Sequence, residues 1–210
     1  MEHLLHLYSL LYDAQYPVVC IDERPCTLHA NVIEPLPLAP GKPLRYDYEY
    51  ERKGTCVLFV AVEPLTGFRI VEVSRQRKQT DYTRFMQQLA QHYRSAKRIQ
   101  IVQDNLNTHQ SGSFYKTLRP DEAFALTQRF DFHYTPKKAS WLNMAEIEIN
   151  AIVRQCLKRR RIESLEMMAH EISQLVKERN KKKIKITWQF TTEHARDKLG
   201  RHYDKILSNN

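Results

Sequence analysis

Ile99-Gln100-Ile101-Val102-Gln103-Asp104-Asn105-Leu106-Asn107-Thr108-His109 is the stretch of sequence that decides the fold. Its first five residues are mostly β-branched and apolar, which is the composition of a buried strand. The carboxylate of Asp104 follows at once, and the Asn-Leu-Asn after it favours a turn. An open α/β sheet presents a reactive group in this way, at the carboxyl end of a central strand. Taken alone, Asp104 is better explained as a turn residue, so its assignment depends on the other acids of the chain.

A second apolar run ends in an acid. Pro17-Val18-Val19-Cys20-Ile21-Asp22-Glu23 predicts another buried strand, with Asp22 at its end. Two carboxylates at neighbouring strand ends repel each other unless a cation lies between them. Ligands that are all oxygen atoms select hard cations, so the pattern indicates Mg²⁺ or Mn²⁺.

The remaining periodicities predict a mixed sheet. Further strands are expected at Thr55–Glu63, Phe68–Ser74 and Phe130–Tyr134, and Gly67 supplies the positive φ that closes the first hairpin. Helices are expected after an N-cap at Thr80, over residues 144–160 and 165–180, and after Thr191 or Thr192. The first of these helices has a core-facing apolar stripe, formed by Tyr82, Phe85, Met86, Leu89 and Tyr93. Three antiparallel strands followed by two strands that alternate with helices are the order of a ribonuclease-H-like α/β fold, a five-stranded mixed sheet flanked by helices. The ends of its first and fourth strands are adjacent, so Asp22 and Asp104 are expected to converge.

The length and charge of the chain limit its class. Its 210 residues fit a single domain, and 33 basic against 24 acidic side chains leave a net charge of +9, which suits a polyanionic partner. The longest clearly apolar run, Cys56–Val62, is far too short to span a membrane. The four cysteines have no paired spacing and indicate reduced thiols. These features favour a cytoplasmic protein that binds nucleic acid, without a membrane partner.

Residues 24–54 contain five of the nine prolines and are predicted to be neither helix nor central strand. A connection this long in a compact domain is expected to be functional or to contact a partner. Tyr46, Tyr48 and Tyr50 alternate with charges near its end, a pattern that favours an amphipathic edge strand over a base-stacking platform. Residues 1–16 are expected to be a lead-in to the first strand.

Asn143-Met144-Ala145-Glu146 offers a third carboxylate, 146 − 104 = 42 positions after Asp104. The same residues also match a capping box, with Asn143 as the N-cap and Glu146 at the third helical position. Taken alone, Glu146 fits either reading equally well. Three acids at these points of the predicted fold together favour a metal site.

Six short motifs stand in a defined order: Cys20-Ile21-Asp22-Glu23, Arg45-Tyr46-Asp47-Tyr48-Glu49-Tyr50, Asp104-Asn105-Leu106-Asn107-Thr108-His109, Tyr134-Thr135-Pro136-Lys137, Ser140-Trp141-Leu142-Asn143-x-x-Glu146 and Trp188-Gln189-Phe190-Thr191-Thr192. In this order they resemble the catalytic domain of bacterial insertion-sequence transposases of the mariner superfamily, the DDE group. The resemblance extends from Val18 to about Tyr203.

The resemblance implies a function and a set of site residues. Asp22, Asp104 and Glu146 take the places of the three family acids, and the chemistry implied is two-metal phosphoryl transfer. Asp22 would bridge two Mg²⁺ or Mn²⁺ ions, with Asp104 and Glu146 on one each. The expected reaction is DNA strand cleavage at transposon ends, followed by joining to target DNA. Position in the helix favours Glu146 over Glu148, which is predicted to be a flanking charge.

Further residues are candidates for contacts with DNA. Asn105 and His109 are candidates for orienting substrate or supporting the metal ligands, although each alone is more typical of a structural residue. Lys137, Lys138, Lys158, Arg159 and Arg160 are expected to follow phosphates, although each alone is more typical of a solvated face. The Pro-rich segment occupies the place where mariner relatives carry a loop that clamps a second subunit, so a homodimer through residues 24–54 is expected. When bound to DNA the protein would lie at the bacterial nucleoid.

The chain also departs from the family. Lys138-Ala139 replaces the His-Gly that commonly precedes Ser-Trp-Leu-Asn. Only about 17 residues precede the first strand, so the N-terminal helix-turn-helix region of the family is expected to be absent, as in a catalytic fragment, a split product or a decayed copy. Two alternatives stay open: a ribonuclease-H-like nuclease that cuts without joining, and a remnant that only binds DNA. The Trp-Leu-Asn-x-x-Glu block argues against the first, and the presence of all three acids argues against lost chemistry.

Overall fold

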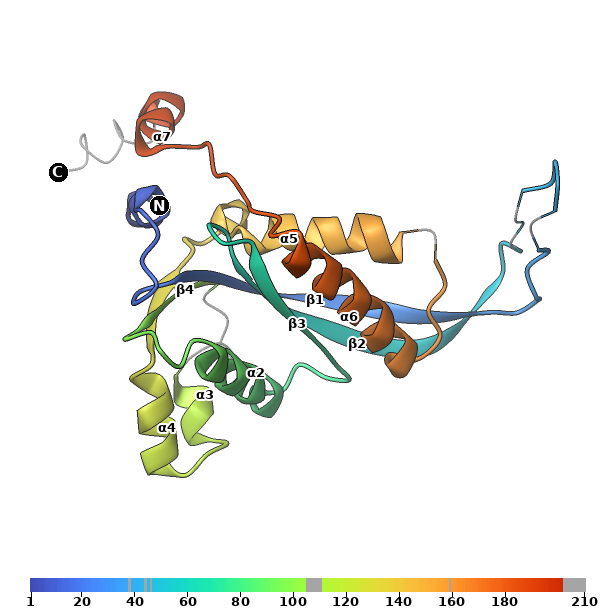
Figure 1. The fold of residues 1–210 in the computed structure, drawn as a ribbon, viewed down its shortest axis with the longest axis horizontal. Helices are drawn as coiled ribbons and strands as arrows, with labels where there is room; N and C mark the ends of the chain where they lie inside the picture. The colour runs from blue at the N-terminus through green and yellow to red at the C-terminus, as the bar shows by residue number, and fades with distance from the viewer. Residues whose placement is uncertain (38, 44, 46, 105–110, 159, 202–210) are drawn as a thin grey trace.

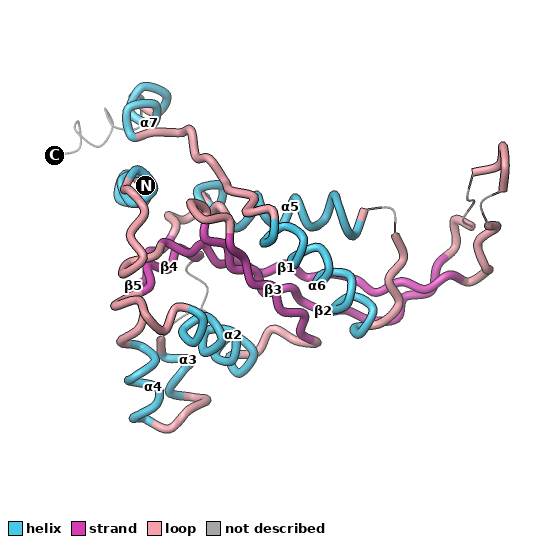
Figure 2. Tube along the Cα trace, in the orientation of Figure 1, coloured by secondary structure: helices cyan, strands magenta, loops and turns pink. Residues whose placement is uncertain are grey.

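The computed structural model describes residues 1–37, 39–43, 45, 47–104, 111–158 and 160–201. Helices cover both faces of a central sheet (Figures 1 and 2). The elements in chain order are α1 Glu2–Ser9, β1 Val18–Asn31, β2 Tyr50–Glu63, β3 Phe68–Ser74, α2 Gln79–His92, β4 Ile99–Gln103, α3 Gly112–Tyr115, α4 Pro120–Thr127, β5 Phe130–Tyr134, the 3₁₀ turn η1 Ser140–Leu142, α5 Ala145–Ile152, the π-helical turn η2 Val153–Leu157, α6 Leu165–Lys181 and α7 Thr192–Lys198.

The described residues form one five-stranded sheet in the order β3-β2-β1-β4-β5. β1 and β3 both pair with β2 antiparallel, whereas β4 runs parallel to β1 and β5. This topology confirms the predicted mixed sheet, and β3, β4 and β5 have the predicted bounds. Cys20 of β1 is in register with Val102 of β4. Asp22 and Asp104 each follow two residues later, so the two acids emerge at the same edge of the sheet.

Alternating side chains of β2 build the core on both faces of the sheet. Val57, Phe59 and Ala61 pack against α2, α3 and α4. Leu58 and Val60, on the opposite face, pack against α5 and α6. Figure 1 shows these two helical layers on either side of the strands. The predicted apolar stripe of α2 is confirmed, since its apolar side chains lie in the first of these clusters.

Residues 1–16 are more than a lead-in. Leu4, Leu5 and Leu7 of α1 are buried in a third apolar cluster, together with Val102 of β4 and Ala195 of α7. α1 contacts α7 directly, so this cluster joins the two ends of the described chain. The sequence signal was weak because the helix has only 8 residues.

Within the described part of residues 24–54 there is strand that was not predicted, but it pairs along one edge only and is therefore not central. β1 continues to Asn31 and β2 begins at Tyr50, so the segment is mostly a long hairpin that projects from the body of the molecule (Figure 1). Pro25 lies inside β1, opposite Val57. β4 pairs with β1 only as far as Cys20, so at Pro25 no described strand adjoins the second edge of β1 and a missing N–H is tolerated. We call residues 24–54 the arm.

Several smaller expectations also need correction. Tyr48 is exposed and lies outside any strand, and Tyr46 is outside the described residues. Lys78, not Thr80, is the N-cap of α2. The predicted helix over 144–160 ends earlier, because regular α-helix stops at Ile152 and a π-helical turn follows. Thr191 caps α7 as expected, accepting a hydrogen bond from the His194 amide.

In the part of the chain that is described, no helix is both long and apolar enough to cross a bilayer.

Candidate active site

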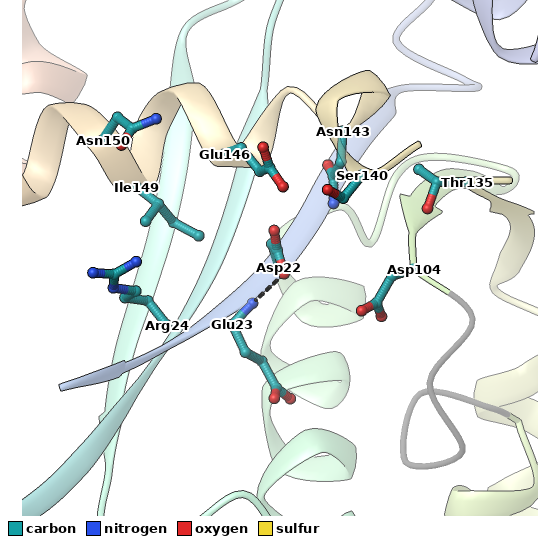
Figure 3. A pocket seen from close by; sticks show the side chains of 10 residues that line it. All are labelled: Asp22, Glu23, Arg24, Asp104, Thr135, Ser140, Asn143, Glu146, Ile149 and Asn150. Carbon is teal, nitrogen blue, oxygen red and sulfur yellow. Dashed lines mark hydrogen bonds between the residues drawn. The ribbon is translucent and has the colours of Figure 1, made fainter. Parts of the chain in front are cut away.

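A pocket of about 370 Å³ opens where β1 passes the carboxyl end of β4 and meets the first turn of α5. Figure 3 shows that side chains from these elements face one space. The residues that line it are Asp22, Glu23, Arg24, Asp104, Thr135, Ser140, Asn143, Glu146, Ile149 and Asn150. Asp22, Asp104 and Glu146, the three acids predicted from the sequence, are therefore brought to one pocket.

Two of these acids are supplied by neighbouring parallel strands. Asp22 lies within β1, and its Oδ1 accepts a hydrogen bond of 2.8 Å from the amide of Glu23. Asp104 directly follows β4, and both side chains are half-buried. Asp104 thus follows a strand end, as predicted, whereas the prediction that Asp22 ends its strand was wrong, because β1 continues to Asn31. Asp22 lies just beyond Cys20, where the pairing of β1 with β4 stops.

Glu146 is the second residue of α5 and points from that helix toward Asp22 (Figure 3). The structure contains only half of the predicted capping box. The Asn143 Oδ1 accepts a 3.1 Å hydrogen bond from the Ala145 amide, but the Asn143 amide donates to the Ser140 carbonyl. The carboxylate of Glu146 therefore faces the pocket and does not close the box.

The pocket contains the ligand atoms that suit a hard cation, although its carboxylates do not converge on a single point. Asp22, Asp104 and Glu146 contribute carboxylate oxygens, and the described residues that line the pocket include no sulfur or imidazole. Within the described residues, no three His, Cys, Asp or Glu side chains form a cluster tight enough to hold one ion together. Three carboxylates in one pocket repel one another unless a cation lies between them.

Two hydrogen bonds of Gln103 fix the carboxyl end of β4. Gln103, directly before Asp104, is buried, and its Oε1 accepts a 2.9 Å hydrogen bond from the hydroxyl of Tyr82 on α2. The Gln103 carbonyl accepts a 2.9 Å bond from the amide of Thr135, beyond β5. Burial raises the pKa of the Tyr82 phenol well above its usual range, so Tyr82 keeps its proton and remains a donor. The helical periodicity around Tyr82 had indicated only a core residue, without a polar role.

Arg24 is a pocket residue that was missed at the level of sequence. It is exposed, and it lines both the acidic pocket and an adjacent groove of about 320 Å³. Lys158 and Arg160 line that groove as well. The signal was present in the sequence, because residues i and i+2 of a strand share a face and Arg24 follows Asp22 by two. Glu23, between them, is paired with Arg77 at 3.4 Å.

The candidate DNA-binding residues are only partly placed in the structure. Lys137 and Lys138 are exposed in the loop between β5 and η1, a few residues before Ser140 of the pocket. Arg160 is paired with Glu171 at 2.8 Å, so its charge is partly compensated. Asn105, His109 and Arg159 lie outside the described residues.

The prediction that Glu148 is a flanking charge was wrong. Its side chain is 0% exposed and lies between two buried arginines. Arg179 of α6 donates from Nε to Oε1 and from Nη2 to Oε2, both at 2.9 Å. Arg69 of β3 is also paired with Oε1 at 2.9 Å, although its Nε–H is not aligned for a hydrogen bond. The partners lie far away in the sequence, so a helical wheel could not reveal them.

Comparison with solved structures defines the class of fold. The chain resembles the crystal structure of the Mos1 mariner paired-end complex with Mn, at 17% identity and a TM-score of 0.55, covering 87% of this chain and 55% of that one. The Mos1 strand transfer complex gives 18% identity and a TM-score of 0.53, with 84% and 51% coverage. The Mos1 transposase paired-end complex with the left transposon end gives 18% identity and a TM-score of 0.54, covering 87% of this chain and 55% of that one. The chain thus has the ribonuclease-H-like fold of these proteins and spans about half of their length.

The sequence also defines the family. The family model described as DDE superfamily endonuclease matches residues 17–169, which include β1, β4 and α5 with all three acids. The chain therefore belongs to the DDE superfamily endonucleases. No curated protein matches the sequence.

Proposed function

We propose that this chain is the catalytic domain of a transposase, which cleaves DNA strands at transposon ends and joins them to target DNA. One observation carries the proposal: in a member of the DDE superfamily endonucleases, carboxylates from β1, β4 and α5 line a single pocket. The resemblance of the fold to Mos1 transposase complexes supports the same reading. Residues 1–210 would form a single catalytic domain.

Divalent cations fit the three carboxylates. Asp22, Asp104 and Glu146 would hold two Mg²⁺ or Mn²⁺ ions, and the Mos1 complex with Mn supports the choice of metal. The bound ions would supply Lewis-acid stabilisation of the oxygens that attack and leave phosphorus. Before any ion binds, the three carboxylates repel one another, so the surrounding protein must hold them close together.

The protein's own cations would bind and orient the DNA. The exposed guanidinium of Arg24 lies on the same strand face as Asp22, where it can bind a phosphate next to the reacting one. Lys137, Lys138, Lys158 and Arg160 would extend this contact along the backbone, helped by the net charge of +9. In cleavage, the oxygen of water bonds to phosphorus as the bond to the 3′ oxygen breaks. In joining, that 3′ oxygen loses its proton and bonds to a phosphorus atom of the target, as the bond from this phosphorus to the target's own 3′ oxygen breaks and the released oxygen takes up a proton.

The proposal includes a homodimer formed through the arm. The arm extends away from the sheet (Figure 1), and its far part exposes apolar side chains, namely Val32, Ile33, Leu36 and Tyr48. Exposed apolar side chains on a projecting hairpin are suited to bind a second protein surface. Sedimentation velocity tests this part: the wild type should sediment as a dimer, and the Leu36→Ser, Tyr48→Ser double variant as a monomer. A monomeric wild type would rule out the homodimer. We also propose a cytoplasmic location at the bacterial nucleoid, where the substrate DNA lies.

Two assays on the wild type test the proposed function. Supercoiled plasmid should be nicked in Mn²⁺ and left intact in EDTA. A labelled duplex with a free 3′-hydroxyl should become joined to plasmid under the same conditions. Nicking without joining would assign the chain to the nucleases that cut only. Binding of DNA without either product would identify a non-enzymatic remnant.

A further inference from the structure

The side chain of Asn143 links the two elements that carry Asp22 and Glu146. Its Nδ2 donates a 2.7 Å hydrogen bond to the carbonyl of Ile21, directly before Asp22 in β1. Its Oδ1 accepts a 3.1 Å bond from the amide of Ala145, directly before Glu146 in α5. One amide group therefore connects the main chain next to one acid with the main chain next to the other, across 122 positions of sequence.

The two partners fix the orientation of this amide. A main-chain carbonyl can only accept and a main-chain N–H can only donate, so Nδ2 must face Ile21 and Oδ1 must face Ala145. Asn143 is 2% exposed, and both of its polar atoms are bonded to the main chain. Aspartate at this position has no donor for Ile21. A serine hydroxyl is one bond shorter, so it can cap α5 but cannot span the same gap.

The turn that carries Asn143 is held by further hydrogen bonds. The amide of Asn143 donates to the Ser140 carbonyl at 2.7 Å, and its carbonyl accepts from the Glu146 amide at 3.1 Å. The hydroxyl of Tyr8, on α1, donates to the Leu142 carbonyl at 2.8 Å. These bonds hold the turn to its neighbours, whereas the Asn143 side chain ties it to the strand that carries Asp22.

Electrostatics explain why such a link is needed. The carboxylates of Asp22 and Glu146 face each other across the pocket, and their repulsion pushes the first turn of α5 away from β1 (Figure 3). A buried hydrogen bond between the two elements opposes this separation. The same bond restricts the motion of α5 relative to β1 before a cation binds. Binding therefore has to restrict less conformational freedom.

We propose that Asn143 is a positioning residue, which holds Asp22 and Glu146 at the separation that a divalent cation requires. It acts through the main chain of Ile21 and Ala145 and contacts neither the cation nor DNA. This inference rests on the proposed function and deepens it. Residues that orient metal ligands typically change metal affinity about 10- to 100-fold when they are replaced, and we expect an effect of that size here.

The chain offers a matched control in Asn180. Its Nδ2 donates to the Arg69 carbonyl and its Oδ1 accepts from the Arg69 amide, both at 2.9 Å. It therefore joins a helix, α6, to a strand, β3, by the same two kinds of bond, and its Oδ1 also accepts a 3.3 Å hydrogen bond from Arg69 Nη1. Asn180 does not line the acidic pocket. Asn180→Ala should thus lower the melting temperature as Asn143→Ala does, without affecting metal binding.

The test measures the Kd for Mn²⁺ by electron paramagnetic resonance of free Mn²⁺, at a temperature where circular dichroism shows each variant folded. Asn143→Ala should raise the Kd about tenfold or more, whereas Asn180→Ala should leave it unchanged. Asn143→Ser, which retains an acceptor for Ala145, should be more stable than Asn143→Ala and still bind Mn²⁺ weakly. It replaces Asn143→Ala in the comparison should the alanine variant fail to fold.

Wild-type Mn²⁺ affinity in either Asn143 variant would overturn the inference, and so would an equal loss of affinity in Asn180→Ala. These results differ from a failure of the proposed function. In that case the wild type itself would bind no Mn²⁺ and would nick no DNA.

Discussion

Glu146 and Glu148 lie two residues apart on α5 but have opposite environments. Glu146 is half-buried and points into the pocket that Asp22 and Asp104 also line. Glu148 is fully buried and paired with Arg69 and Arg179. A separation of two residues is about 200° around a helix, so one carboxylate faces the pocket and the other faces the core. The two glutamates therefore have separable roles, in chemistry and in folding.

The pairing of Glu148 predicts a large effect on stability. Glu148→Gln leaves Arg69 and Arg179 as two buried positive charges without a counter-ion. Removing one partner of a buried ion pair typically costs about 3–5 kcal/mol. The free energy of unfolding, measured by urea titration, should fall by an amount of this order. Glu146→Gln serves as the control and should change it little. A Glu148→Gln variant as stable as the wild type would show that the arginines are compensated in another way.

Gly67 is predicted to tolerate no side chain. Its φ is +73°, and an added Cβ would lie 2.6 Å from the carbonyl carbon and oxygen of Ile184. Gly41 has nearly the same φ, +74°, but no atom would lie within 4 Å of its Cβ. Gly67→Ala should therefore destabilise the protein by well over about 1 kcal/mol, and Gly41→Ala by clearly less. Equal losses in thermal unfolding would mean that the contact with Ile184 is irrelevant.

The environment of His133 should make the protein less stable in acid. His133 Nε2 is 2.7 Å from Gln100 Oε1, and its Nδ1 is 2.7 Å from Nε2 of His3. Burial, and then the proximity of His3, lower the pKa of His133, while Asp131 opposes the shift. As the pH falls below the ordinary histidine pKa, the unfolded chain takes up a proton that the folded protein resists, so stability decreases.

Thermal unfolding between about pH 8 and pH 5 tests this dependence on the His133 pKa. The melting temperature of the wild type should fall toward the acid end more steeply than that of His133→Asn. His170→Gln, which replaces an exposed histidine of α6, should follow the wild type. Parallel curves for the wild type and His133→Asn would show that His133 does not cause the loss of stability in acid.

Binding to duplex DNA should depend strongly on salt and weakly on sequence. The net charge of +9 implies that several phosphates are neutralised, so the affinity should fall about tenfold or more between low and physiological ionic strength. The Lys137→Ala, Lys138→Ala double variant should show a smaller slope of log Kd against the logarithm of the salt concentration. Lys182→Ala is the control, because Lys182 is paired with Glu178 at 2.5 Å. A footprint confined to one sequence, surviving high salt, would instead reveal a sequence-specific recognition element in the chain.

Local sequence patterns predicted much of the fold and of the acidic pocket. The apolar runs before Asp22 and Asp104 specify two strands, and the order of elements places those strands side by side, as the register of Cys20 with Val102 shows. Both acids could be assigned in this way because each follows an apolar run that stops where β1 and β4 cease to pair. Glu146 needed the motif around Asn143, since periodicity alone could not choose between two glutamates.

The features that were missed depend on contacts between distant residues. Pro25 favours an irregular segment by residue type, but it lies in β1 beyond the end of its pairing with β4. Glu148 has the local pattern of a surface charge, because its partners Arg69 and Arg179 lie on other elements. The link between Asn143 and Ile21 likewise spans most of the chain. Such contacts follow from packing, which overrides local pattern and propensity.

The central claim is that Asp22, Asp104 and Glu146 together hold the cations that drive DNA cleavage. The most direct measurement is the rate of plasmid nicking in Mn²⁺ for Asp22→Asn, Asp104→Asn and Glu146→Gln, each of which keeps the shape of the side chain and removes its charge. Asp121→Asn, at an exposed carboxylate of α4, is the matched control. The three pocket variants should lose cleavage by orders of magnitude while remaining folded, and the control should cleave like the wild type. Undiminished cleavage in the three variants, or by the wild type in EDTA, would contradict the account.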